Sequence, residues 1–434
     1  MTQPPPVRMR RLAVAACLLS LTFAGHAMAR IKLITLPVRE RVEVHLDNPN
    51  ATLVEEERIV PLVQGENQVD FSWAGTPIDP NSIVFRVLGP TADFPNLTAN
   101  VLSVSYPPNE NALVWQVSAS AAGSVRVRIS YLLGGLNRDF NYRAVASQNE
   151  QTLTLSQYVR INNLANETFD DANLFVGFGE RFQKMLGRAE TKEMLVNKFE
   201  NVPIEKTYTA SVVEFGYLNQ PQDKLNVAMH YVLTNDKQHA LGAEPLPVGK
   251  VRIFQKDNQG TTAFLGEDWA QLTQVSDNPQ SGLNKLRRQN HAQWLIPLGA
   301  KMQLYLGVVQ DIAVKRRVTD RQNERVAGDV YDRSVTLKYE LENFKDTPVK
   351  VRLVELAGPL ASGEGIGAPL PLNWKIIRQS QPQPGVTDLA DLLATDPEDT
   401  NAGCMTFAVP VPAAVDGKPG KAAGVVTVVF TNTK

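Results

Sequence analysis

Apolar and polar residues alternate with a period of two along most of this chain. In residues 41–48, valine and leucine take every second position, with arginine, glutamate and histidine between them. The same alternation recurs in residues 125–130, 335–343 and 349–356. It is typical of strands that bury one face and expose the other to water. Residues 425–430 are apolar almost throughout, which predicts a strand buried on both faces.

Glycine, proline and asparagine separate these segments, as expected for turns between antiparallel strands. The sequence therefore predicts an all-β fold of two or three antiparallel β-sandwich domains, immunoglobulin-like in type, with one or two short helices. Residues 186–200 are the stronger helix candidate, because Met185, Met194 and Leu195 fit a helical spacing. Residues 386–394 predict one or two further turns. Neither candidate is long enough to indicate repeated βαβ units.

Polar or glycine- and proline-rich stretches indicate loops and domain boundaries. They cover residues 276–290, 358–371 and 379–403. The predicted division consists of a signal peptide at 1–29, an N-terminal β-sandwich at 30–132, a middle β domain at 133–323 and a C-terminal β-sandwich at 324–434.

The first 29 residues have the pattern of a secretory signal peptide. Three arginines precede an apolar run at residues 12–23, and an A-x-A cleavage site follows at residues 27–29. The apolar run is shorter than the roughly 20 residues that cross a bilayer. We therefore expect an exported protein, periplasmic or secreted, that begins at Arg30 and has no membrane span after cleavage.

Composition indicates a folded protein with no general affinity for nucleic acid. The 434 residues are 43% hydrophobic and 21% charged, with a formal net charge of −1. Two basic segments, residues 285–291 and 315–325, lack the aromatic partners that stack on bases, and we interpret them as solvated strand edges and loops. Signal cleavage leaves Cys404 as the only cysteine, which excludes an internal disulfide and predicts a small packed side chain.

Residues 245–268, PLPVGKVRIFQKDNQGTTAFLGED, form the most patterned stretch and raise the question of a phosphate loop. Gly249 precedes Lys250, but no second glycine lies upstream at the required spacing, and a strand pattern follows instead of a helix. The stretch is better interpreted as a hairpin whose turn uses Gly260. The glycines of residues 363–367 lead into prolines, so they cannot open a dinucleotide-binding helix. We expect no cofactor.

Metal-ligating residues are scattered along the chain. Only His230 and His239 are close in sequence, and two isolated imidazoles are a weak basis for a zinc site. Oxygen-rich stretches at residues 170–171, 257–258 and 396–403 match no defined calcium loop, so they are interpreted as turns. The sequence therefore predicts no metal ligand.

Motifs for nucleophilic catalysis are missing: the sequence has no G-x-S-x-G, S-x-x-K or H-E-x-x-H. No catalytic residue is predicted. Acidic residues occur at Glu180 and at residues 55–57 and 267–268. Glycosidase carboxylates meet in space and not in sequence, so a hydrolase stays open as an alternative.

The order of several segments resembles the bacterial "domain of unknown function 4139" family, to which mucoidy-inhibitor-A-like proteins belong. Residues 245–268 resemble its hallmark segment, and further similar segments lie at residues 51–89, 129–146, 162–180, 307–320, 339–356, 373–380 and 407–414. The chain departs from the pattern in lacking sustained heptads and in reading GLNRDFNY at residues 135–142. The resemblance implies an exported, β-rich protein and no established reaction.

Two hypotheses about function follow from these observations. The first is an exported cell-envelope β-sandwich protein of uncharacterised function that binds or scaffolds without catalysis, its partner an envelope protein or a polysaccharide. Exposed strand edges would suit it to adding a strand from a partner. The alternative is a secreted hydrolase acting on polysaccharide or peptide, which needs two acids in one cleft; Glu180 and Glu267 are candidates.

Overall fold

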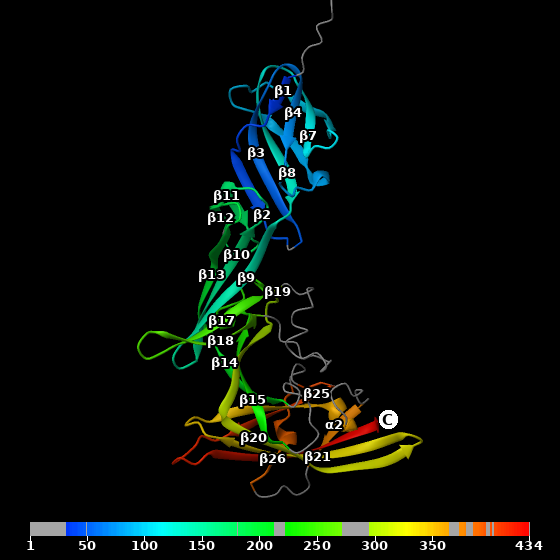
Figure 1. The fold of residues 1–434 in the computed structure, drawn as a ribbon. Coiled ribbons are helices and arrows are strands. Elements are labelled where there is room, and N and C mark those ends of the chain that lie inside the picture. The colour runs from blue at the N-terminus through cyan, green and yellow to red at the C-terminus, as the bar shows by residue number, and fades with distance from the viewer. Residues whose placement is uncertain are drawn as a thin grey trace, which may run out of the picture. The chain divides into compact units, whose positions relative to one another are not determined.

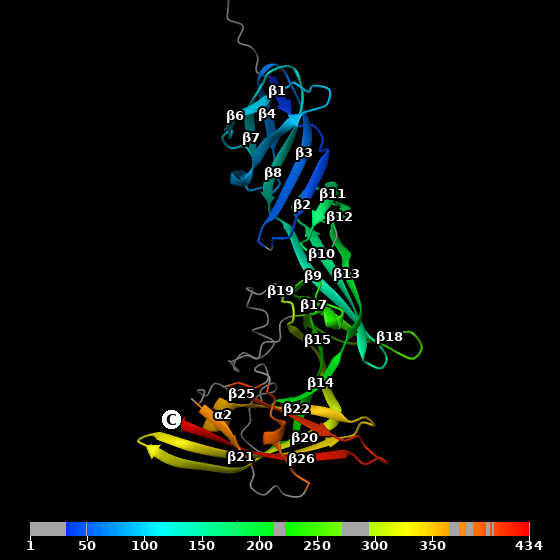
Figure 2. The ribbon, with the colours of Figure 1, turned by 180° about the vertical axis from the view of Figure 1, so that it is seen from behind.

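The computed structural model describes residues 32–48, 50–179, 181–211, 222–270, 295–363, 373–378, 385–395, 400–401 and 403–433. The protein is all-β, with one short α-helix and three single-turn 3-10 helices in the described part of the chain (Figures 1 and 2). The predicted signal peptide and the polar stretch at 276–290 lie outside the described residues. Among the described helices, none is long and apolar enough to cross a membrane.

The chain forms two compact units. Unit 1 comprises residues 1–136, 162–177 and 181–190, and unit 2 comprises residues 137–161, 178–180 and 191–434. Unit 1 contains a four-stranded sheet, β1-β4-β7-β6, and a six-stranded sheet, β12-β11-β2-β3-β8-β5. Its elements are β1 (Lys32–Thr35), β2 (Arg41–His45), β3 (Thr52–Leu62), β4 (Gly65–Ser72), η1 (Pro80–Ser82), β5 (Val84–Pro90), β6 (Ala99–Ser105), β7 (Ala112–Ala119), β8 (Gly123–Leu133), β11 (Phe169–Phe175) and β12 (Phe182–Leu186).

The two sheets of unit 1 meet through aromatic side chains. Phe71 of β4 lies 5.9 Å from Tyr131 of β8, and Trp115 of β7 lies 4.4 Å from Phe85 of β5, measured between ring centroids. Large rings bury much apolar area and add a favourable ring–ring contact. The predicted alternation is confirmed here: Val42, Val44 and Leu46 are buried, and so are the apolar residues at every second position of β8, Val125, Val127 and Ile129.

Unit 2 contains a five-stranded sheet, β13-β10-β9-β17-β18, a nine-stranded sheet and the short pair β16-β19. The nine-stranded sheet has the order β23-β26-β21-β20-β15-β14-β22-β25, with β24 paired to β26. The strands are β9 (Leu136–Ala146), β10 (Thr152–Asn163), β13 (Thr191–Pro203), β14 (Glu205–Ser211), β15 (Gln222–Thr234), β16 (Leu246–Pro247), β17 (Gly249–Lys256), β18 (Thr262–Ala270), β19 (Leu295–Ile296), β20 (Lys301–Ala327), β21 (Val330–Asn343), β22 (Val349–Leu356), β23 (Asn373–Ile377), β24 (Thr387–Asp388), β25 (Cys404–Val411) and β26 (Gly420–Thr433). The helices are η2 (Lys237–His239), α2 (Ala357–Ser362) and η3 (Leu389–Leu392).

The core of the nine-stranded sheet is apolar and is covered in part by α2 (Figure 1). Leu360 of α2 is fully buried, and Gly363 ends the helix in a left-handed conformation with φ 74°. As predicted, the alternate residues of β21 point inward: Val335, Leu337, Tyr339 and Leu341 are all buried. Cys404 is buried, as expected for a small packed side chain.

The predicted all-β fold is confirmed, but its sheets are mixed and not antiparallel throughout. Parallel pairs in the described part of the chain include β1–β4, β2–β11, β9–β17, β14–β22 and β24–β26. Each of these pairs joins strands that are distant in sequence, whereas adjacent hairpins are antiparallel. Sequence alternation reports burial of a face and carries no information on the direction of a distant partner.

Residues 186–200 form no helix, so the prediction of one there was wrong. The segment contains the last residue of β12 and most of β13, joined by a turn in which Gly187 N donates to Glu190 Oε2 at 2.6 Å. The acids and lysines that suggested a solvated helix face lie instead along β13, a terminal strand of its sheet. Charged residues are a common protection for such edges.

The other local predictions met mixed outcomes. The one or two turns predicted in residues 386–394 are confirmed as the single turn η3, which Asp388 caps by accepting from Ala390 N at 3.0 Å. Residues 425–430 form part of β26, but only Val426, Val428 and Phe430 are buried and their neighbours are half-buried. Residue 323, the predicted end of the middle domain, lies inside β20, which pairs with β21 on both sides of that point.

Candidate functional site

Residues 245–268 contain the predicted hairpin, and no phosphate loop. Strands β17 and β18 pair antiparallel, and Gly260 adopts φ 82° in the turn between them. Gly249 has a packing role, because a Cβ built there would lie 2.4 Å from the carbonyl oxygen of Phe140 in β9. Lys250 extends from the strand to form an ion pair with Glu267 at 2.7 Å.

We expect Gly249→Ala to lower the free energy of unfolding by about 1–3 kcal/mol, the usual cost of overpacking. The clashing atom belongs to the backbone, so it can give way only if β9 and β17 separate. Urea-induced unfolding measures the change. Gly266→Ala in the same hairpin is the control, because the nearest atoms to its Cβ would lie 4.0 Å away. Equal stability of the two variants would contradict the packing role.

The two acidic candidates of the hairpin, Glu267 and Asp268, are both held by neighbouring residues. Glu267 is held by Lys250 and Arg252, and these hydrogen bonds, led by that from Lys250, lower the pKa of its carboxyl group. Asp268 accepts from the backbone N–H of Tyr305 at 2.7 Å and so joins β18 to β20. Glu180 lies outside the described residues. Glu267 and Asp268 therefore have structural partners.

The two histidines lie on different elements, and the turn predicted at residues 257–258 is confirmed, whereas Asp170 and Asp171 lie within β11, so the turn predicted there was wrong. His230 lies on β15 beside the ring of Tyr305, whereas His239 lies in η2 and pairs with Asp236 at 2.7 Å. Asp257 is a turn residue whose side chain accepts from Gln259 N and Thr261 N. Residues 396–399 of the third oxygen-rich stretch lie outside the described residues.

Unit 2 has an open groove of about 700 Å³ between the five-stranded and nine-stranded sheets. Glu150, Gln255 and Leu265 line one side, and the opposite side includes residues 309–311 of β20 and the exposed ring of Phe344. Sequence spacing could not have indicated this groove, because its walls come from segments nearly 200 residues apart.

The carboxylates of the groove are both held by lysines. Glu150 accepts from Lys206 Nζ at 2.6 Å and from the hydroxyl of Tyr231, and Asp311 pairs with Lys345 Nζ at 2.5 Å. Burial, followed by the negative charges of Glu150 and Asp311, raises the pKa of Tyr208 to about 12. Two acids thus line one groove, each already paired with a cation.

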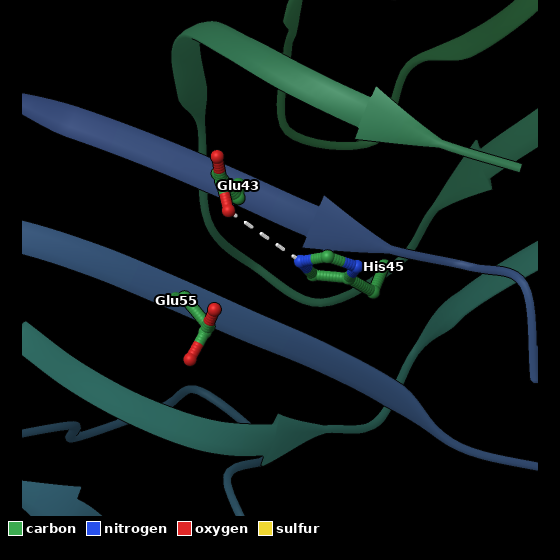
Figure 3. Close-up of side chains that lie close together, drawn as sticks. All are labelled: Glu43, His45 and Glu55. Carbon is green, nitrogen blue, oxygen red and sulfur yellow. Dashed lines mark ion pairs between the residues drawn. The ribbon is translucent and has the colours of Figure 1, made fainter. Parts of the chain in front are cut away.

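Unit 1 has a cluster of two carboxylates and one imidazole on the six-stranded sheet (Figure 3). Glu43 and His45 lie two residues apart on β2, and Glu55 lies directly opposite Glu43 on β3. We call these three residues the carboxylate–imidazole cluster. The cluster is not predicted from the sequence, although all three residues occupy outward positions of their strands. The missing information was the register between β2 and β3.

A third feature is the exposed terminal strand β6 of the four-stranded sheet (Figure 2). Its side chains are exposed to 40% at Val101, 53% at Leu102 and 45% at Val104. Val84 and Leu88 of β5, the terminal strand of the other sheet, are exposed as well, and β5 lies close to β6. Unit 1 therefore has an apolar strand edge open to water.

No protein-family model matches the chain, and no curated protein matches it.

Proposed function

We propose that this chain is an exported cell-envelope protein, built of immunoglobulin-like β-sandwiches, that binds an extended segment of a partner protein without catalysis. The apolar edge strand β6 is the observation that carries the proposal. The signal-peptide pattern of residues 1–29 supports export, and so does the resemblance to the family of domain of unknown function 4139.

The composition of β6 distinguishes it from the other terminal strands of the four larger sheets. Terminal strands carry unpaired N–H and C=O groups, and natural proteins commonly protect them with charged residues or proline. Strand β13 follows this rule, with Lys192, Glu193, Lys198 and Glu200 along its length. Strand β6, ANVLSVS, has no charged residue and no proline. An unprotected apolar edge of this kind is suited to strand addition.

A β-bulge modifies the edge locally. The register between β6 and β7 shifts between Val101 and Ser103, which places Leu102 outside the regular alternation. Val101, Leu102 and Val104 therefore all remain exposed. Backbone groups of the strand supply affinity in this mode of recognition, and the exposed side chains supply selectivity for apolar residues of the partner.

Peptide selection tests the proposal. A displayed library of random nine-residue peptides is panned on the full chain, and selected peptides are assayed against Val104→Lys and, as a matched control on the protected edge, Leu195→Lys. We expect apolar, alternating peptides that protect the amides of β6 from hydrogen exchange. Their affinity should fall by about 10-fold or more with Val104→Lys, because a desolvated charge at the contact costs more than 1.4 kcal/mol.

Peptides that bind both variants equally, or that protect only the groove of unit 2, would contradict strand addition at β6. Export is tested separately by sequencing the mature N-terminus. A chain that begins at Met1, or that stays in the cytoplasm, would contradict it.

A hydrolase acting on polysaccharide or peptide has one observation in its favour, which is the pair Glu150 and Asp311 in one groove. Each of these carboxylates is paired with a lysine, Glu150 with Lys206 and Asp311 with Lys345. Turnover of envelope polysaccharides or peptides that is lost in both Glu150→Gln and Asp311→Asn would support this alternative over binding alone.

A further inference from the structure

We propose that the carboxylate–imidazole cluster of Glu43, His45 and Glu55 binds a divalent transition-metal ion, with Zn²⁺ as the best fit. The cluster lies in unit 1 and is independent of strand addition at β6. It joins two neighbouring strands, β2 and β3, and its Glu43–Glu55 pair lies at the middle of their pairing.

Interatomic distances in the cluster are close to those of a zinc site. The three potential ligand atoms all lie within 4.8 Å of one another, and His45 Nε2 lies 3.6 Å from Glu43 Oε2 (Figure 3). Tetrahedral zinc with bonds of about 2.0–2.2 Å places its ligand atoms roughly 3.4 Å apart. Glu43 and His45 are thus already near that separation, and Glu55 needs only a small side-chain movement.

The imidazole of His45 is held in place and has an unsatisfied atom. Its ring stacks on Phe175 of β11, with centroids 4.4 Å apart and planes inclined by 11°. Nε2 is buried and makes no hydrogen bond within the described part of the chain. A buried polar atom without a partner costs free energy, and a metal ion at this position would remove that cost.

Each carboxylate uses one oxygen for outer partners. Glu43 Oε1 accepts from Arg41, and Oε2 faces His45. Glu55 Oε1 accepts from Arg86 at 3.0 Å and from the Ser130 hydroxyl at 2.8 Å, whereas the nearest cation to Oε2 is Arg128 at 3.8 Å. One oxygen of each group is therefore oriented by hydrogen bonds, and the other can coordinate, as is usual for metal-ligating carboxylates.

One imidazole and two carboxylate ligands favour a transition-metal ion over Mg²⁺ or Ca²⁺. Mg²⁺ and Ca²⁺ prefer oxygen ligands alone, whereas imidazole with carboxylate suits Zn²⁺ and its neighbours among the transition metals. Three protein ligands leave a fourth position for water. Bound metal would connect β2 to β3 through side chains, in addition to their backbone hydrogen bonds.

Zinc titration of the untagged, chelator-treated full chain tests the proposal. Isothermal titration calorimetry should give one zinc ion per chain. His45→Phe keeps an aromatic ring to stack on Phe175 but removes the ligand, and we expect zinc affinity to fall by more than about 100-fold, beyond the range for loss of an outer partner. The matched control is His239→Phe, which removes a histidine paired with Asp236 at the surface and should leave affinity unchanged.

Co²⁺ provides a second readout, because a tetrahedral cobalt site has intense visible absorption. We expect these bands in the parent chain and in His239→Phe, and their loss in His45→Phe. If His45→Phe fails to fold, Glu43→Gln serves for the same comparison. The proposal is overturned if the parent chain binds no stoichiometric zinc, if His45→Phe and Glu43→Gln both bind as the parent does, or if His239→Phe abolishes binding.

Discussion

Replacing Glu355 with alanine should lower the free energy of unfolding by about 3–5 kcal/mol, because it leaves the guanidinium of Arg316 in the core without its carboxylate. Arg316 of β20 and Glu355 of β22 are both fully buried, and Arg316 donates to both carboxylate oxygens, with Nη2 donating to Oε2 at 2.9 Å. Tyr339 of β21 donates its hydroxyl to the same carboxylate. Burial, followed by the charge of Glu355, raises the pKa of Tyr339 well above its usual value.

Urea-induced unfolding gives the total change, and hydrogen exchange of amides in β20–β22 localises it to unit 2. The double variant Arg316→Met with Glu355→Leu is the control, because it removes both charges and keeps the volume. It should recover most of the lost stability. If Glu355→Ala and the double variant were equally unstable, lost packing would explain the effect, and the buried ion pair would not.

The alternation along β20 and β22 already indicates that Arg316 and Glu355 both point into the core. The pattern of β20 buries Ile312 and Val314, and Arg316 is the next residue of that series. Glu355 continues the inward series of β22 in the same way. We interpreted the segment around Arg316 as solvated because it is basic, although period-two alternation already placed one of its arginines in the core.

Glu56 of unit 1 is a second charged residue at an inward strand position. It occupies an inward position of β3 between Val54 and Val60, is fully buried, and is paired with Arg39 and Arg58. A charge at an inward position therefore predicts a buried partner of opposite sign. Which strand supplies that partner depends on register and strand order, and alternation along one strand contains neither.

Register is also the reason that the candidate sites could not be predicted. The alternation identified the strands and their buried faces, and the turn residues identified the hairpin of β17 and β18. The carboxylate–imidazole cluster depends on Glu43 lying opposite Glu55, and the groove of unit 2 depends on the approach of two sheets. The helix predicted at residues 186–200 was wrong for a different reason, because a charged edge strand has a composition similar to that of a solvated helix.

Two buried asparagines, Asn163 and Asn343, each fix the loop that follows their strand, and replacing either with alanine should cost about 3 kcal/mol. Asn343 Nδ2 donates to the carbonyl oxygens of Thr347 at 2.9 Å and Pro412 at 2.8 Å, and Oδ1 accepts from Lys345 N at 3.0 Å. Alanine would leave these three backbone groups without their side-chain partner, at roughly 1–3 kcal/mol for each that water cannot reach.

Asn163 makes the same arrangement in the other unit. Nδ2 donates to the carbonyl oxygens of Glu167 at 2.7 Å and Gly187 at 2.9 Å, and Oδ1 accepts from Ala165 N at 3.1 Å. Each asparagine side chain forms hydrogen bonds to the residues two and four positions ahead of it, which holds its own loop. Its third hydrogen bond connects that loop to a segment distant in sequence, at Gly187 for Asn163 and at Pro412 for Asn343. Loss of this third bond should release residues near Gly187 in one variant and near Pro412 in the other.

Hydrogen exchange separates the two effects, because Asn163→Ala should increase exchange in unit 1 alone and Asn343→Ala in unit 2 alone. Asn258→Ala, at an exposed turn position, is the control and should change stability by less than about 0.5 kcal/mol. Asn→Asp at either buried site should also destabilise, since a carboxylate keeps the acceptor but loses both donors. Stability equal to the parent in Asn343→Asp would show that the amide donors do not hold the loop.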